Sequence, residues 1–121
     1  MEERAATETI PTPATTAGCL RVTGAANEQE ALHLTERVAR RLDARIKRWD
    51  QDHLDLHLVI RNRDTSQQKV TLEAHIARRG ATYFVASSRL EDVLDAVADV
   101  AHDIRRQVGR FVDTRVATRR T

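Results

Sequence analysis

The chain has 121 residues and a net charge of +2, and 31% of its residues are charged, which fits one domain with a modest core. Its one cysteine, Cys19, excludes an internal disulfide and a cysteine-ligated metal cluster, and we expect a buried thiol at the start of a strand. No apolar run comes near the ~20 residues that span a bilayer, and Glu2 and Glu3 argue against a secretory signal. These features predict a cytoplasmic protein that does not cross a membrane.

Positive charge is carried almost entirely by arginine, with eighteen arginines against two lysines. The guanidinium fork suits contacts with phosphate better than an ammonium group does. A GC-rich genome would also raise the arginine content, so only the arrangement of the arginines along the chain can indicate a function.

The beginning of the chain is poor in residues that could be buried. Residues 1–17 are mostly Thr, Ala, Glu and Pro, and we expect them to form a disordered arm. A short strand is predicted from Cys19 to Thr23, where Leu20 and Val22 alternate with polar residues, and Gly24 ends it.

A basic helix is predicted to begin after an N-cap at Asn27, with Glu28 and Glu30 in its first turn, and to run to about Trp49. Its apolar stripe at helical spacing consists of Ala31, Leu34, Val38, Leu42, Ile46 and Trp49. Its basic side chains, mostly off that stripe, are Arg37, Arg40, Arg41, Arg45, Lys47 and Arg48. One side of this helix is therefore expected to cover a core while the rest presents positive charge.

Three strands are predicted to follow. The stretches Leu54–Arg63 and Lys69–Arg78 both alternate apolar and polar residues, and Asp64–Ser66 forms a turn between them, so we expect a hairpin. A third strand is predicted over Thr82–Ser87. Its pattern leaves two inward sets open, namely Tyr83 with Val85 or Phe84 with Ala86.

The last helix is predicted to begin at a Ser88 cap and to change charge along its length. Its apolar stripe is Leu90, Val93, Leu94, Val97, Ala98, Ala101, Ile104 and Val108. Its early acids are Glu91, Asp92, Asp95 and Asp99, and its later basic residues are Arg105, Arg106 and Arg110. Acids at the start and bases at the end match the helix dipole.

The element order β-α-β-β-β-α predicts an α+β fold. We expect a four-stranded, mainly antiparallel sheet with the first strand at an edge and two helices packed on one face. The predicted domain covers residues 18–112, and residues 113–121 are expected to form a flexible basic tail.

Little in the sequence indicates catalysis or metal binding. A hairpin centred near Ser66 would place His57 directly opposite His75, where two imidazoles could ligate zinc or copper, but no third ligand has a defined spacing. Nucleophile–base–acid spacing and a glycine-rich phosphate loop are both absent. We therefore expect a non-enzymatic protein without a metal, a cofactor or a small-molecule substrate.

Basic side chains gathered on a helix, apart from the acids, are typical of contacts with a phosphate backbone. Such contacts give affinity without reading sequence, and they weaken as salt rises. Few aromatic residues are expected on the surface, which argues against stacking on single strands and favours structured RNA as the partner.

The pattern also resembles the ribosome hibernation-promoting factor family, also described as sigma-54 modulation or ribosomal subunit interface proteins. The segments that carry the resemblance are LRVTG from Leu20, the basic helix ending IKRWD, the hairpin LDLHLVIRNR…KVTLEAHI, and VASSRLEDVLDAVADVAHDIRRQ. Together they cover about Cys19 to Val112. The chain departs from the family's usual pattern at Arg89–Glu91, where Asp-Met-Tyr is usual, and at Val100 and Asp103, where basic residues are usual.

The resemblance implies a short-form member or an isolated N-terminal domain that binds the small ribosomal subunit in stress, occupies the channel of mRNA and tRNA, and blocks translation. The residues expected to contact rRNA phosphates are Arg37, Arg40, Arg41, Arg45, Lys47, Arg48, Arg105, Arg106 and Arg110. One alternative is a protein-interaction module of the same fold that has lost ribosome binding and binds a protein partner or a second copy. Another is a double-stranded RNA-binding domain, although such domains have a lysine-rich start to the last helix.

Overall fold

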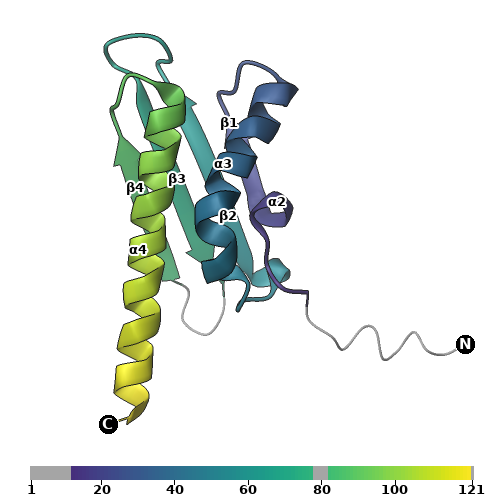
Figure 1. The fold of residues 1–121 in the computed structure, drawn as a ribbon, viewed down its shortest axis with the longest axis vertical. Coiled ribbons are helices and arrows are strands. Elements are labelled where there is room, and N and C mark those ends of the chain that lie inside the picture. The colour runs from purple at the N-terminus through teal and green to yellow at the C-terminus, as the bar shows by residue number, and fades with distance from the viewer. Residues whose placement is uncertain (1–11, 78–81, 121) are drawn as a thin grey trace, which may run out of the picture.

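The computed structural model describes residues 12–77 and 82–120, with side chains as far as Phe111, and confirms the predicted α+β architecture. The helices are α2 (Thr16–Cys19), α3 (Glu28–Ile46) and α4 (Val93–Arg120), with a 3-10 turn, η1, at Gln51–His53. The strands are β1 (Leu20–Thr23), β2 (Leu54–Arg61), β3 (Lys69–Ile76) and β4 (Thr82–Ser88). Figure 1 shows α3 and α4 side by side on one face of the sheet.

The sheet has the order β1-β2-β3-β4, with β1 parallel to β2 and the other pairs antiparallel. The edge position of β1 and the antiparallel meander are therefore as predicted. Of the two inward sets left open for β4, the structure has Phe84 and Ala86 toward the core and Tyr83 and Val85 exposed.

The predicted register of the hairpin is wrong by two residues. His57 lies opposite Glu73, and His75 lies opposite Asp55, so the two imidazoles do not face each other. The reason lies in the connection between β2 and β3, where Asn62 adopts a φ of 52° and Asp64 a φ of 64°. These left-handed residues centre the hairpin on residue 65 and remove the hypothetical pair of metal ligands.

The core lies between the sheet and the two long helices. Helix α3 contributes the stripe that the sequence predicts, with Leu34, Val38, Leu42 and Ile46 all buried. The inward residues of β2 and β3 alternate along each strand, and those of α4 recur at helical spacing. Each element buries one side, and burying a large aliphatic side chain contributes about 1.5–3 kcal/mol.

The segment 12–17 packs against the domain and is not a disordered arm as expected. The Thr12 carbonyl accepts a hydrogen bond from the Gln51 N–H at 2.8 Å, and the Ala14 N–H donates to the Trp49 carbonyl at 2.9 Å. The Thr16 N–H donates to the Asp43 carboxylate at 2.8 Å, and Ala14 is buried. Small side chains let this backbone approach the end of α3. Residues 1–11 of the expected arm lie outside the described residues.

Cys19 is buried as expected, at the end of α2 and directly before β1. Burial raises the pKa of its thiol, and its Sγ lies 3.8 Å from the Gln51 carbonyl oxygen. The thiol is therefore held in its protonated form, as a small core side chain.

Helix α4 begins later than predicted and extends further. Ser88 is the last residue of β4, and Leu90 is exposed rather than part of the apolar stripe. The Asp92 carboxylate accepts hydrogen bonds from the N–H groups of Leu94 at 2.8 Å and Asp95 at 3.1 Å, so Asp92 is the cap. The helix continues through Arg120 where a flexible tail was expected, because no proline stops it.

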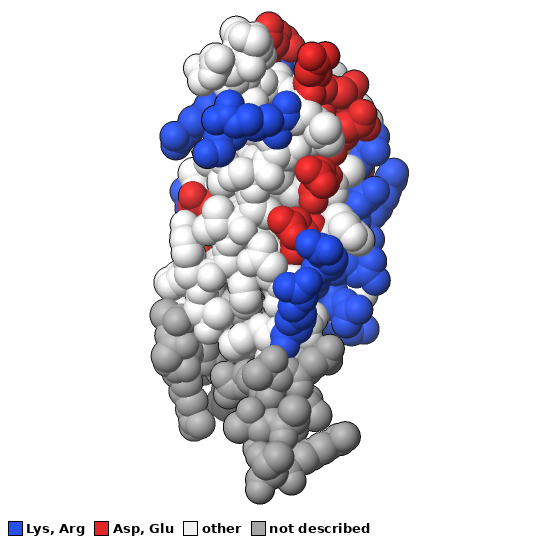
Figure 2. Space-filling model, turned by 90° about the vertical axis from the view of Figure 1, so that its left-hand side faces the viewer, with Lys and Arg blue, Asp and Glu red and all other residues white. Residues whose placement is uncertain are grey.

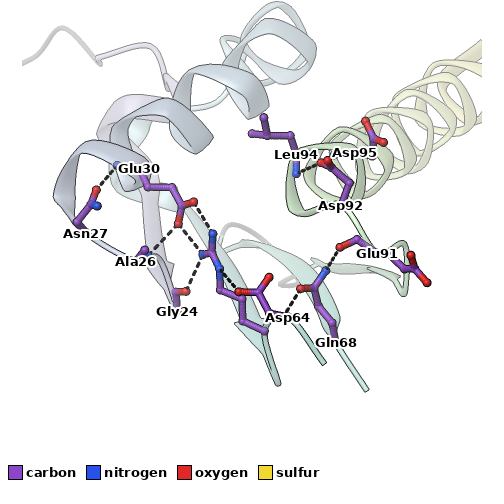
Figure 3. A network of polar contacts seen from close by, with 11 residues as sticks. Gly24, Ala26, Asn27, Glu30, Asp64, Gln68, Glu91, Asp92, Leu94 and Asp95 are labelled. Atoms are coloured by element: carbon purple, nitrogen blue, oxygen red, sulfur yellow. Dashed lines mark hydrogen bonds and ion pairs between the residues drawn. The ribbon is translucent and has the colours of Figure 1, made fainter. Parts of the chain in front are cut away.

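The start of α3 is fastened to the β2–β3 connection by an ion pair (Figure 3). The Arg63 guanidinium donates two hydrogen bonds of 2.5 Å to the Glu30 carboxylate and one of 3.4 Å to the Gly24 carbonyl. Glu30 also accepts a hydrogen bond from the Ala26 N–H at 2.8 Å. The hydrogen bonds from Arg63 lower the pKa of Glu30 from 4.5 to about 2.

We expect this ion pair to make the stability of the domain depend on acid pH. Because the pKa of Glu30 is lowered on folding, its contribution is complete above about pH 4.5 and is lost as the pH falls toward 2. Glu30→Gln should reduce the free energy of unfolding by on the order of 1–2 kcal/mol at pH 7, allowing for solvent screening, and by little near pH 2. Urea denaturation at a series of pH values measures this, with Glu28→Gln in the same turn as the control. A pH-independent effect of Glu30→Gln would contradict the assignment.

The observed cap of α4 at Asp92 can be distinguished by mutation from the cap predicted at Ser88. Asp92→Ala should reduce the free energy of unfolding by about 1 kcal/mol, because two N–H groups of the first turn lose their acceptor. Glu91→Ala is the control, since no hydrogen bond or ion pair is formed by its side chain with the described residues. Thermal and urea denaturation compare the variants. A larger loss in Ser88→Ala than in Asp92→Ala would favour the cap predicted from the sequence.

Candidate nucleic-acid interface

The six basic residues predicted at the first long helix all lie on or just after α3. Arg40 and Arg45 are exposed, Arg37 and Arg41 are half-buried along one flank, and Lys47 and Arg48 follow the last helical residue and are exposed. Because the buried stripe takes the side toward the sheet, the cations are left on the flank and the outer side of the helix.

Two hydrogen bonds show how α3 and α4 are rotated about their own axes. Asp43 of α3 accepts a hydrogen bond from Thr16 of α2, so its flank faces away from α4 (Figure 1). Arg37 and Arg41 are one turn apart on the opposite flank, toward α4. On α4, Gln107 donates to the Val85 carbonyl of β4 at 2.9 Å, which places that flank at the sheet edge.

The predicted basic residues of α4 therefore divide into two groups. Arg105 is on the α3 side, since Gln107 two residues later faces the opposite edge. The helices run in the same direction (Figure 1), and Arg41 and Arg105 are almost equally far from their starts, 13 residues after Glu28 and 12 after Val93. Arg106 and Arg110 are exposed on the open side of α4, and Arg106 forms an ion pair of 3.0 Å with Asp103.

The charges on this side of the molecule are separated. Figure 2 shows a row of acidic side chains along the upper part of α4, followed by basic side chains that border those of α3. Within residues 12–77 and 82–111, none of the six basic residues at α3 forms an ion pair, and Arg41 makes a hydrogen bond of 3.5 Å to the Arg37 carbonyl. These unpaired cations remain available to an external anion.

The structure explains one departure from the family's usual pattern. Val100 is 1% exposed and belongs to the core, so a basic residue at this position of α4 would not reach the surface without repacking. Asp103 is half-buried and holds Arg106. The basic surface of this chain is therefore centred on α3 and not on the middle of α4.

The described part of the chain contains no group of three or more His, Cys, Asp or Glu residues that could hold a metal ion. None of its helices has the length and apolar character needed to cross a membrane. The sequence analysis missed Arg63, which forms an ion pair with Glu30 at the start of α3. Arg63 reaches Glu30 because Asn62 and Asp64 on either side of it are left-handed, and no local sequence pattern indicates this contact.

No protein-family model and no curated protein matches the chain. Among solved structures, the chain is similar to a ribosomal subunit interface protein from Coxiella burnetii, with a TM-score of 0.53 and 12% sequence identity. The match covers 78% of this chain and 97% of that one. At this identity the similarity shows a shared fold, the fold that the sequence resemblance implied.

Proposed function

We propose that the chain is a non-enzymatic ribosome-binding factor that contacts small-subunit rRNA through the basic surface of α3 and blocks translation in stress. The observation that carries the proposal is the set of unpaired arginines on a helix held firmly against a sheet. The contacts we propose are the six basic residues at α3, with Arg105 beside them and Arg106 and Arg110 at the margin. The partner follows from the fold shared with a ribosomal subunit interface protein and from the sequence resemblance.

Helix α3 presents its positive charges from a backbone that is held in place. Its buried stripe and the Glu30–Arg63 ion pair fix the helix, so its cations point outward from a rigid support. Arginine side chains on such a support can donate forked hydrogen bonds to phosphate oxygens. No exposed row of aromatic side chains accompanies them on the described surface, so backbone contact with structured RNA fits better than base stacking.

A second candidate function has its own observation in favour. Asp92, the cap of α4, and Asp95 and Asp99 in its first half are exposed acids that would repel RNA phosphates. Figure 2 shows a row of acidic side chains along the upper part of this helix. That row suits a protein partner, as the protein-interaction alternative requires. Salt separates the two, because phosphate contacts weaken steeply with ionic strength and an apolar protein interface responds little.

We expect purified protein to co-sediment with small ribosomal subunits at low salt and to be released steeply as salt rises. Arg40→Glu/Arg45→Glu/Arg48→Glu should abolish co-sedimentation, because it places negative charge opposite rRNA phosphates while changing only exposed residues. Circular dichroism and thermal denaturation should show that the fold is kept.

The matched control is Arg21→Gln, which removes an exposed arginine that already pairs with Asp55 at 3.3 Å. It should co-sediment like the wild type. Unchanged co-sedimentation of the triple variant would contradict the proposed surface, and an absence of binding by the wild type at low salt would favour the protein-interaction function.

A further inference from the structure

The outer face of the sheet, which α3 and α4 leave open, has three cations at one end. Arg61 of β2 lies directly opposite Lys69 of β3. Val70 lies opposite Ser88, the last residue of β4, and the exposed Arg89 comes directly after Ser88 at this same end of the sheet. Neighbouring strands are about 4.8 Å apart. Arg61, Lys69 and Arg89, here called the sheet-end cation row, therefore lie across three adjacent strands.

The row is separate from the basic surface of α3. Figure 2 shows a band of basic side chains on the upper sheet side of the molecule, apart from the basic side chains of the helices. This is the end of the sheet at which β2 ends, β3 begins and β4 ends. Arg63, the other arginine of this region, is on the helix side in its ion pair with Glu30.

Elsewhere on the same face, Arg21 forms an ion pair of 3.3 Å with Asp55. Within the described structure, by contrast, no member of the sheet-end cation row has an ion pair or a side-chain hydrogen bond. Like charges directly opposite each other destabilise a sheet. Solubility alone would be served equally well by charges of alternating sign, so this row favours a bound anion.

The surroundings of the row identify the kind of anion. Thr71 and Ser87 form the next cross-strand pair, with their hydroxyl oxygens 3.2 Å apart and both exposed or half-buried. Hydroxyl groups and guanidinium groups together are good donors to phosphate oxygens. A stable protein interface would need an apolar centre, whereas the side chains next to the row, Thr71 and Ser87, are polar, and the exposed Tyr83 and Val85 lie further away, toward the start of β4.

We propose that the sheet-end cation row binds the phosphate backbone of RNA, on the face opposite the α3 surface. The inference rests on the proposed function in taking RNA as the ligand, but its evidence is the unpaired row itself. Because the two basic surfaces point in opposite directions, one molecule would contact two RNA segments at once, as between the two walls of a cleft.

The test measures the affinity for a fluorescent 20-base-pair RNA duplex over a salt series. Arg61→Gln/Lys69→Gln/Arg89→Gln should weaken binding and reduce the slope of log affinity against log salt by about 2 to 3, at roughly 0.7–0.9 for each lost phosphate contact. Arg21→Gln, on the same face but already paired, should keep the wild-type slope. In a capture assay, wild-type protein bound to an immobilised duplex should retain a second labelled duplex, and the row variant should not.

A comparison with Arg40→Gln/Arg45→Gln/Arg48→Gln keeps the two proposals distinguishable. If the row variant has the wild-type affinity and slope while the α3 variant is weakened, the row is overturned and the proposed function stands. If only the row variant is weakened, the α3 surface is wrong and the row stands. The row variant should be at least as heat-stable as the wild type at low salt, because repulsion is removed, and a lower Tm would overturn the proposal by showing that the three side chains stabilise the sheet.

Discussion

One constraint orders this structure: two amphipathic helices must bury their apolar stripes on the same face of one small sheet. Leu34, Val38, Leu42 and Ile46 of α3 and the apolar stripe of α4 belong to one buried cluster with the inward residues of the sheet, and the two helices pack side by side. With only four aromatic residues in the chain, this aliphatic contact supplies most of the core. Among the side chains that the structure describes, the charged residues of the helices are consequently turned to the flanks or to the outside. The other face of the sheet is not covered by either long helix.

The same constraint explains how charge is distributed. The arginines of α3 lie on its flank and outer side because the buried side of the helix is already filled, and Val100 cannot be replaced by a surface cation because it lies in the core. The acids of α4 gather near its start, where the helix dipole favours them, and Arg105, Arg106 and Arg110 come later. A ligand with phosphates would therefore approach along α3 and the lower part of α4, and the acidic row would set the limit of that approach.

Two sets of contacts hold α3 in a defined position. The ion pair between Glu30 and Arg63 holds its start to the β2–β3 connection, and the segment 12–17 holds its end through the bonds of Ala14 and Thr16. Both sets of contacts join residues that are distant in sequence, and both restrict the backbone of the helix rather than its exposed cationic side chains. A surface that recognises a rigid phosphate array benefits from such support, because less entropy is lost when the side chains bind.

The sequence by itself determined the element order, the apolar stripes, the Asn27 cap and the positions of the α3 arginines, because these depend on residue periodicity and local capping. Only the tertiary structure decided the hairpin register. A shift of two residues leaves the inward and outward faces of both strands unchanged, so the alternation of apolar residues cannot fix the register. The two left-handed residues in the turn fix it instead. It also decided the cap at Asp92, the packing of residues 12–17 and the alignment of Arg61, Lys69 and Arg89. Each of these features depends on which distant segment of the backbone lies next to the residue concerned. The pattern of residues along the chain does not indicate that.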